Sequence, residues 1–434
     1  MSLTGHSMGG HGTWSLASLL PGTFASAAPS AGWISFTTYT GAPPANATDP
    51  LAAVFAQANL PSDTLSFLPN LLQARIYAIH GDADDNVPVT EARRMRKELA
   101  AIRHKGVGWH EEPGAGHWWD NDPAPGAACV DYPAAFQMIR EARIPSGEGA
   151  IRFVTASPAV SATDRWLMIE QQIQPLALSE ADLDWQGDSV TGTTSNVRRL
   201  SLDVPGLKRV VLDGQTLKVS GRPVRLARAG GAWAVATKPV PAAEKNPLRS
   251  GPFKQAFGRR MILIYGTLGT PDENAWSYAK ARYDAEAFLY RGNGAPEVLS
   301  DREFLKQRTP DRSVILYGNA DTNAAWPVLL QNAPLQLNRS SALVGKTQKT
   351  GGDLACLFTY PRPGSKVALV GVVGGTGLIG CRATNRLAYF SAGVAYPDWT
   401  VFTPDVFQSG IGGALGAGIF GNDWRVETGQ SAWR

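Results

Sequence analysis

The spacing of hydrophobic and polar residues changes along this chain, and the changes predict successive regions. Up to about residue 147, apolar stretches at residues 75–79 and 107–112 have the length of short strands. Helix-like runs cover residues 13–20, which end at a Pro-Gly pair, and residues 134–142. This first region therefore combines strands with helices.

Short β-rich runs separated by turn residues dominate residues 148–238. A small β-sandwich is typical of such a pattern, and nothing in this region is chemically distinctive. The Asp213-Gly214 pair marks a turn between two of the runs. The proline-rich residues 239–252 that follow predict a linker. The predicted strands lie at residues 151–154, 166–169, 197–202, 209–212 and 233–236.

Strands alternate with helices again in residues 253–434. Alternation of this kind predicts a parallel α/β layer with helices on both faces, so we expect a second, doubly wound α/β domain of unknown role. The predicted fold class is therefore α/β, with the β-sandwich between two α/β regions. The strands are expected at residues 261–265, 313–317 and 366–373, and the helices at 273–290, at 323–330 and up to about 389.

Residues 375–380 (Gly-Thr-Gly-Leu-Ile-Gly) directly follow a predicted strand and match the dinucleotide fingerprint. A nucleotide pyrophosphate on a helix N-terminus is one interpretation. However, the fingerprint normally opens its domain, only 54 residues follow here, and the nearest suitable acid, Asp398, lies in a turn sequence. We therefore favour a close-packed glycine turn and expect no cofactor. A non-catalytic nucleotide-binding or scaffold protein stays as an alternative.

Residues 5–9 (Gly-His-Ser-Met-Gly) have the spacing of a nucleophile elbow, in which a serine occupies a strained strand-to-helix turn. Glycines two residues on either side are expected because the sharp turn leaves no room for Cβ atoms. The turn would lift Oγ of Ser7 above the sheet edge, where the amides of the following helix face developing negative charge. The pattern alone is weak, so partners are needed.

A serine nucleophile needs a histidine base and a carboxylate that orients it. All six histidines lie at or before residue 117. Asp84 lies in the polar loop after residues 75–79, and His117 lies in the Gly-rich loop after residues 107–112. The order serine, acid, histidine is that of the α/β-hydrolases.

Other polar residues near these loops have less specific interpretations. Asp82 and Asp85 compete with Asp84 but are expected to be solvated. His80 is expected to be structural, and His104, between two basic residues, to be solvated. His6 and His11 flank the elbow, His110 is expected to be packed or exposed, and the histidine spacings suggest no metal site.

Residues 80–88, in the pattern His-Gly-x-x-Asp-x-x-Val-Pro, and the Gly116-His117 pair 33 residues after Asp84 resemble the catalytic domain of the prolyl oligopeptidase family and its esterase relatives. Residues 5–10, followed by Gly-Thr-Trp at 12–14, are similar to the elbow of polyester-depolymerase-like and feruloyl-esterase-like members. The resemblance covers roughly residues 1–145 and implies a partial α/β-hydrolase fold over residues 1–147.

Carried over to this chain, the resemblance implies that Ser7 is the nucleophile, Asp84 the orienting acid and His117 the general base. The backbone amide of Met8 would be an oxyanion-hole donor. The implied activity is cleavage of a peptide or ester bond through an acyl-enzyme. A carbohydrate-ester or polyester carboxylesterase is the alternative, because the large downstream region departs from the family. His6, Trp118 and Trp119 are candidates for lining the substrate site.

Only six residues precede Ser7, whereas an α/β-hydrolase builds strands and an oxyanion donor before its nucleophile. We therefore expect the sequence to be an N-terminally truncated part of a longer hydrolase and to hydrolyse little by itself. The remaining half-sheet is expected to have an exposed edge and poorly covered faces. The absence of a signal peptide says nothing about export, and a secreted or periplasmic location is slightly favoured over the cytoplasm.

The composition mainly excludes certain partners and sites. The 434 residues are 44% hydrophobic and 18% charged, with an unclustered net charge of +4, so neither nucleic acid nor an anionic membrane is implied as a partner. No apolar run approaches the roughly 20 residues of a membrane span. The three cysteines form no redox or metal motif. Residues 46–48 and 338–340 match glycosylation acceptors, and the oligomeric state stays open.

Overall fold

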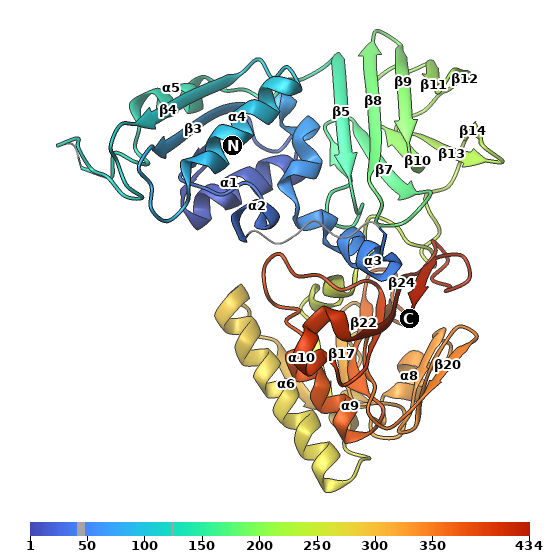
Figure 1. The fold of residues 1–434 in the computed structure, drawn as a ribbon. Helices are drawn as coiled ribbons and strands as arrows, with labels where there is room; N and C mark the ends of the chain where they lie inside the picture. Colours follow the sequence, from blue (N-terminus) through green and yellow to red (C-terminus); the bar gives the residue numbers. More distant parts are fainter. Residues whose placement is uncertain (41–47, 124) are drawn as a thin grey trace. The chain divides into compact units, whose positions relative to one another are not determined.

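The computed structural model describes residues 1–40, 48–123 and 125–434 (Figure 1), so the acceptor at Asn46 lies outside the described residues. The described residues form two compact units. The first comprises residues 1–40, 60–172 and 177–239, and the second comprises residues 48–59, 173–176 and 240–434. The domain boundaries expected from the sequence at residues 147, 238 and 252 stay predictions. The chain is a multidomain α/β protein, as the sequence predicts.

The first unit opens with a four-stranded parallel sheet in the order β1-β2-β3-β4, so β1 and β4 form its edges. Successive strand residues face opposite sides, which places Ala27 and Ala28 in different apolar clusters. The predicted strands of this region are confirmed. Their bounds are β1 (Ser2–His6), β2 (Ser26–Ser30), β3 (Arg75–Gly81) and β4 (Val107–Glu112).

Apolar clusters cover both faces of this sheet. On one face, Trp14 of α1, Leu71 of η2 and Met95 of α4 pack with Ala27, and on the other, Met138 of α5 packs with Ala28. The expectation of poorly covered faces is therefore wrong, because these helices supply enough apolar surface. The helices are α1 (Met8–Leu19), α2 (Phe36–Thr40), η1 (Leu60–Ser62), η2 (Thr64–Gln73), α4 (Val89–Ala101) and α5 (Pro133–Glu141).

The rest of the first unit is the predicted β-sandwich, whose two five-stranded sheets share one apolar core. Their orders are β14-β13-β10-β7-β6 and β12-β11-β9-β8-β5. The sequence did not predict β6, β8, β9, β12 or β13, and of these β8 and β9 are rich in polar residues. The strands are β5 (Gly149–Thr155), β6 (Thr163–Asp164), β7 (Leu167–Gln172), β8 (Ser179–Gln186), β9 (Ser189–Ser195), β10 (Val197–Leu202), β11 (Arg209–Leu212), β12 (Gln215–Lys218), β13 (Val224–Ala229) and β14 (Ala232–Val235).

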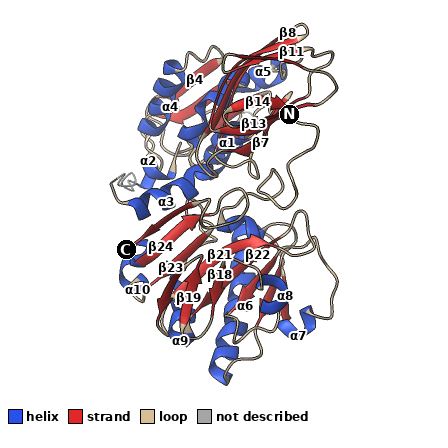
Figure 2. Cartoon of the chain, turned by 90° about the vertical axis from the view of Figure 1, so that its right-hand side faces the viewer, coloured by secondary structure: helices blue, strands red, loops and turns tan. Residues whose placement is uncertain are grey.

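The second unit contains an eight-stranded mixed sheet, drawn as red arrows in Figure 2. Its order is β16-β15-β17-β22-β21-β23-β24-β25. The first four strands are parallel: β15, β17 and β22 were predicted, whereas β16 and the antiparallel half were not. The strands are β15 (Ile262–Tyr265), β16 (Glu297–Ser300), β17 (Val314–Tyr317), β21 (Ala355–Pro361), β22 (Leu369–Gly375), β23 (Trp399–Phe402), β24 (Ala414–Ile419) and β25 (Gln430–Trp433).

Helix α6 packs on the parallel strands and contacts α9, which follows β22. A three-stranded antiparallel sheet also belongs to this unit, formed by β18 (Leu335–Leu337), β19 (Ser341–Val344) and β20 (Thr347–Thr350). The helices are α3 (Pro50–Asn59), η3 (Phe253–Phe257), α6 (Pro271–Gly292), α7 (Asp301–Phe304), α8 (Trp326–Leu330), α9 (Gly377–Ala383), η4 (Thr384–Arg386), α10 (Val406–Ser409) and η5 (Gly410–Gly413).

Part of the proline-rich segment 239–252 is packed into the second unit. Lys245 is 2% exposed, and its Nζ lies 2.5 Å from Oδ2 of Asp398. Arg249 is also buried, and its guanidinium donates to backbone carbonyls. Across the described ranges, no helix has both the length and the apolar character that crossing a bilayer requires.

Candidate active site

Ser7 occupies the turn between β1 and α1 with φ 57° and ψ −116°, a conformation that non-glycine residues rarely adopt. Glycine is required at two nearby positions. A Cβ on Gly5 would lie 2.6 Å from the carbonyl carbon of Gly9, and one on Gly10 would lie 2.3 Å from the Ser30 oxygen. Gly9 itself has open space around its Cβ position. The prediction that sterics require glycine two residues before and after the serine is therefore right for Gly5 and wrong for Gly9. After the serine, the position that has no room for a Cβ is Gly10.

Ser7, His117 and Asp84 form one chain of hydrogen bonds. Oγ of Ser7 lies 2.9 Å from Nε2 of His117, and Nδ1 of that ring lies 2.9 and 3.1 Å from the two carboxylate oxygens of Asp84. Because an ionised carboxylate only accepts hydrogen bonds, Nδ1 carries the proton. Nε2 is therefore left to accept from the Ser7 hydroxyl, which is the tautomer that a general base requires.

The loop after β3 fixes the carboxylate of Asp84, whose side chain is fully buried. Its Oδ1 accepts from the amides of Asn86 and Val87 at 2.9 and 2.8 Å. Burial acts to raise the pKa of Asp84, but the hydrogen bonds from His117 and these amides outweigh it and lower the pKa. The carboxylate is thus held ionised beside the imidazole.

His80 and the neighbouring acids play other parts in this loop. Nε2 of His80 lies 2.8 Å from the Val87 oxygen and 3.2 Å from Oδ2 of Asp84, which supports its expected structural role. Oδ1 of Asp82 instead accepts from the Gly114 amide, and the side chain of Asp85 is exposed. The structure therefore brings Asp84, and neither of the two competing acids, to His117.

His6 lies beside the hydrogen-bonded chain. Its ring centroid is 4.8 Å from that of His117 and 3.8 Å from that of Trp118. Burial, followed by the proximity of His117, lowers the pKa of His6 from 6.5 to about 4, so the ring is neutral at physiological pH. Its Nδ1 lies 3.0 Å from Oγ of Ser30, which donates to the Cys129 oxygen. Sequence reasoning missed Ser30, although its place at the carboxyl end of β2 was a usable signal.

The remaining candidates separate into exposed and packed residues. The side chains of Met8 and Trp118 are 75% and 64% exposed, whereas Trp119 packs against the cluster of Ala28 and Met138. The Met8 amide begins α1, in the first turn, where amides have no partner within the helix. His104 is partly buried and its Nε2 lies 2.9 Å from the Leu71 oxygen, so the prediction of a solvated residue is wrong.

The glycines of residues 375–380 pack against backbone atoms. A Cβ on Gly375 would lie 2.3 Å from the carbonyl carbon of Gly380, and one on Gly380 would lie 2.2 Å from the Leu354 oxygen. Asp398, the acid considered for a ribose, is fully buried and paired with Lys245. Backbone packing accounts for these glycines, in agreement with the favoured interpretation.

Comparison with known families gives a match over the same segment. Residues 1–126 match the prolyl oligopeptidase family. This match contains all three members of the hydrogen-bonded chain.

A curated relative extends over nearly the whole chain. It is an uncharacterized secreted protein of Arthroderma benhamiae, 24% identical over 447 residues, and the alignment covers 98% of this chain and 47% of the relative. The chain thus spans about half the length of the curated relative that it matches.

Two solved PHB depolymerase structures are also similar to part of the chain. One, complexed with an R3HB trimer, is 16% identical with a TM-score of 0.22 and covers 42% of this chain and 62% of that chain. The other, from Penicillium funiculosum, is 17% identical with a TM-score of 0.23 and covers 43% and 63%.

Proposed function

We propose that the first unit is the catalytic part of a serine hydrolase that cleaves a peptide or ester bond through an acyl-enzyme on Ser7. The observation that supports this most strongly is the hydrogen-bonded chain from Ser7 through His117 to Asp84. These residues come from three separate loops after β1, β3 and β4, and they meet with the tautomer and ionisation that nucleophilic catalysis requires.

In the acylation step, Nε2 of His117 takes the hydroxyl proton of Ser7 while Oγ attacks the substrate carbonyl carbon. The Met8 amide stabilises the negative charge that develops on the carbonyl oxygen. The bond to the leaving group then breaks, and the leaving group takes the proton from Nε2. Asp84 stabilises the imidazolium throughout by accepting from Nδ1.

Deacylation repeats these transfers with water. Nε2 of His117 removes a proton from the attacking water, and the new bond forms between the water oxygen and the acyl carbon. The bond to Oγ breaks and Ser7 recovers its proton, releasing a carboxylic acid. His6 assists by position: because it is neutral, it adds no positive charge that would disfavour the imidazolium.

Labelling with a fluorophosphonate probe tests this proposal, since only an activated serine reacts. We expect one adduct, on the peptide that contains Ser7, and no labelling of Ser7→Ala. Ser15→Ala, in the middle of α1, is the matched control and keeps full labelling. An adduct spread over other serines, or labelling that survives Ser7→Ala, would contradict the proposal.

Within this function, the exposed Trp118 favours the ester-cleaving alternative. Its ring packs against His6 at an interplanar angle of 43°, next to His117, and presents an exposed apolar surface that suits a sugar or polyester chain. Competition between an aryl acetate and a peptide amide for the labelled site tests this choice. The choice is supported if the ester protects Ser7 from labelling and if this protection weakens about 10-fold in Trp118→Ala, because stacking of the ester on an aromatic ring contributes about 1 kcal/mol or more. Protection by the peptide alone contradicts it.

Export from the cell is part of the proposal. The curated relative is named a secreted protein, and the sequence slightly favours a secreted or periplasmic location. Fractionation of the native host into cells and medium tests it: enrichment of this protein in the medium is expected, and retention inside the cells contradicts it.

A further inference from the structure

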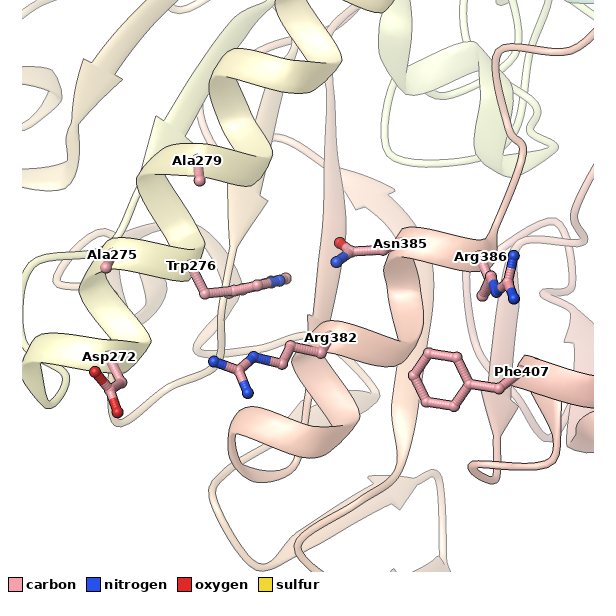
Figure 3. Close-up of a pocket in the computed structure, with 8 residues that line it drawn as sticks. All are labelled: Asp272, Ala275, Trp276, Ala279, Arg382, Asn385, Arg386 and Phe407. Atoms are coloured by element: carbon pink, nitrogen blue, oxygen red, sulfur yellow. The ribbon is translucent and has the colours of Figure 1, made fainter.

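The second unit has a pocket of about 550 Å³ between α6 and the segment formed by α9 and η4. Figure 3 shows its walls, with Trp276 extending from α6 and Asn385 facing it from the other side. The volume is within the range of sites for small organic ligands. The lining residues are Asp272, Ala275, Trp276, Ala279, Arg382, Asn385, Arg386 and Phe407.

Small side chains on α6 create the space. Ala275 and Ala279 are one helical turn apart and face the pocket, whereas Trp276 between them forms its wall. A second hollow of about 400 Å³ shares Trp276, Ala279 and Asn385 and is bordered by Lys280. Nothing in the packing of α6 requires two alanines here, since both are exposed.

Trp276 presents a polar group that the described part of the chain leaves unpartnered. Trp276 is 8% exposed, and its Nε1 has no hydrogen-bond partner in that part of the chain. The indole points from α6 into the pocket, towards Asn385 (Figure 3). A buried N–H donor without an acceptor is costly, and a bound acceptor would remove that cost.

The charges around this donor favour an anion. Within the described ranges, the guanidinium groups of Arg382 and Arg386 have neither an ion pair nor a hydrogen bond, and Figure 3 shows the guanidinium of Arg382 reaching from α9 towards α6. With Asp272 as the single acid in the lining, the two arginines leave a net charge of +1. This balance suits a monoanion, and a guanidinium matches a carboxylate in a bidentate arrangement.

The carbon surfaces specify the rest of the ligand. The faces of Trp276 and Phe407 and the methyl groups of the two alanines form apolar walls. We propose that this pocket binds a planar organic monocarboxylate, with its carboxylate on Arg382 and the Trp276 N–H and its apolar body between the aromatic walls. The site lies within the second unit and does not depend on the chemistry proposed for Ser7.

Calorimetric titration of the full chain with 2-naphthoate tests the proposal. We expect saturable binding that is at least about 10-fold weaker in Arg382→Gln, which loses one charge-assisted contact. Ala279→Leu, which fills the pocket with a residue that suits an exposed helix position, should weaken binding to the same extent. Arg291→Gln, an exposed arginine on α6 outside the pocket, is the matched control and leaves binding unchanged.

Two further ligands test the chemical class. Neutral 2-naphthamide should bind at least about 10-fold more weakly than 2-naphthoate, and inorganic phosphate, which lacks the apolar body, should bind more weakly still. Ser7→Ala should bind 2-naphthoate like the unaltered chain, which separates this site from the proposed active site. Absence of binding, binding unaffected by Arg382→Gln and Ala279→Leu, or phosphate binding as tight as naphthoate binding would overturn the proposal.

Discussion

The chain contains two Gly-rich turns that join a strand to a helix. Both pack glycines closely against backbone atoms, but the hydroxyl group in each turn has different surroundings. At residues 5–10, Ser7 takes a positive φ and its Oγ faces His117. At residues 375–380, Thr376 is extended, and its Oγ1 accepts from the Leu354 amide at 2.9 Å. Both turns need glycine where backbones approach closely, so glycine spacing identifies the turn, while the environment of the hydroxyl indicates its chemistry.

The largest expected difference between the turns is in reactivity. His117→Ala should lower the rate of fluorophosphonate labelling by up to about 10⁶-fold, because the hydroxyl of Ser7 then has no base. Thr376→Ser keeps its contact with Leu354 and should leave the rate unchanged. Stopped assays with intact-protein mass spectrometry measure both rates. Comparable rates in the two variants would remove the chemical distinction between the turns.

A smaller loss is expected when the orienting acid is neutralised. Asp84→Asn keeps an acceptor for the amides of Asn86 and Val87 but favours the wrong tautomer of His117. The labelling rate should fall about 10⁴-fold. Asp85→Asn, one residue along and exposed, serves as the control. A labelling rate of Asp84→Asn within 10-fold of that of the unaltered chain corresponds to a loss of less than about 1.4 kcal/mol. Such a result would show that Asp84 does not orient His117.

Steric demand is the property that the two turns share. Gly10→Ala places a Cβ 2.3 Å from the Ser30 oxygen, and Gly380→Ala places one 2.2 Å from the Leu354 oxygen. Each should lower the free energy of unfolding by about 1–3 kcal/mol, because the backbone must shift. Gly9→Ala, with open space around its Cβ, should change it by less than about 1 kcal/mol. Urea denaturation measures all three, and equal effects of Gly9→Ala and Gly10→Ala would refute the packing argument.

The smallest expected difference is in pH dependence. Burial lowers the pKa of folded His6 from 6.5 to about 4, so between these values the unfolded chain binds a proton that the folded chain does not. Stability near the first turn should therefore fall as pH drops from 6.5 towards 4. The second turn has no histidine in its region, and burial raises the pKa of Asp398, which acts in the opposite direction.

Hydrogen exchange, corrected for intrinsic rates, tests this contrast at pH 4.5 and 6.5, because at the lower pH His6 is protonated in the unfolded chain but still mostly neutral in the folded chain. Protection of peptides from β1 and α1 should decrease at the lower pH, more than protection of peptides from β22 and α9. His6→Gln should reduce the decrease. An equal loss at both turns would show that His6 is not responsible.

Sequence reasoning located the candidate site because its signals are local. The residues around Ser7, Asp84 and His117 are short motifs with defined spacing, so their order alone predicted a meeting that the structure contains. Ser30 was missed because its contact with His6 depends on the pairing of β1 with β2, and its place at the carboxyl end of β2 was the one local signal.

The fold was predictable where apolar runs are continuous. Strands such as β15 and β17 are short apolar runs and were expected. By contrast, β24 (Ala-Leu-Gly-Ala-Gly-Ile) is poor in β-branched residues, and its strand conformation depends on pairing with β23 and β25. The coverage of both faces of the first sheet likewise depends on long-range packing of α4 and α5.

The hydrogen bond between His117 and Asp84 is the part of the account on which the proposed chemistry depends most. Proton NMR of the imidazole N–H region measures it directly, because a strong hydrogen bond to a carboxylate moves the Nδ1 proton far downfield and slows its exchange. We predict such a resonance in the unaltered chain, its loss in His117→Gln, and a shift when Ser7 is phosphonylated. A spectrum without that resonance, or one in which it persists in His117→Gln, would contradict the account.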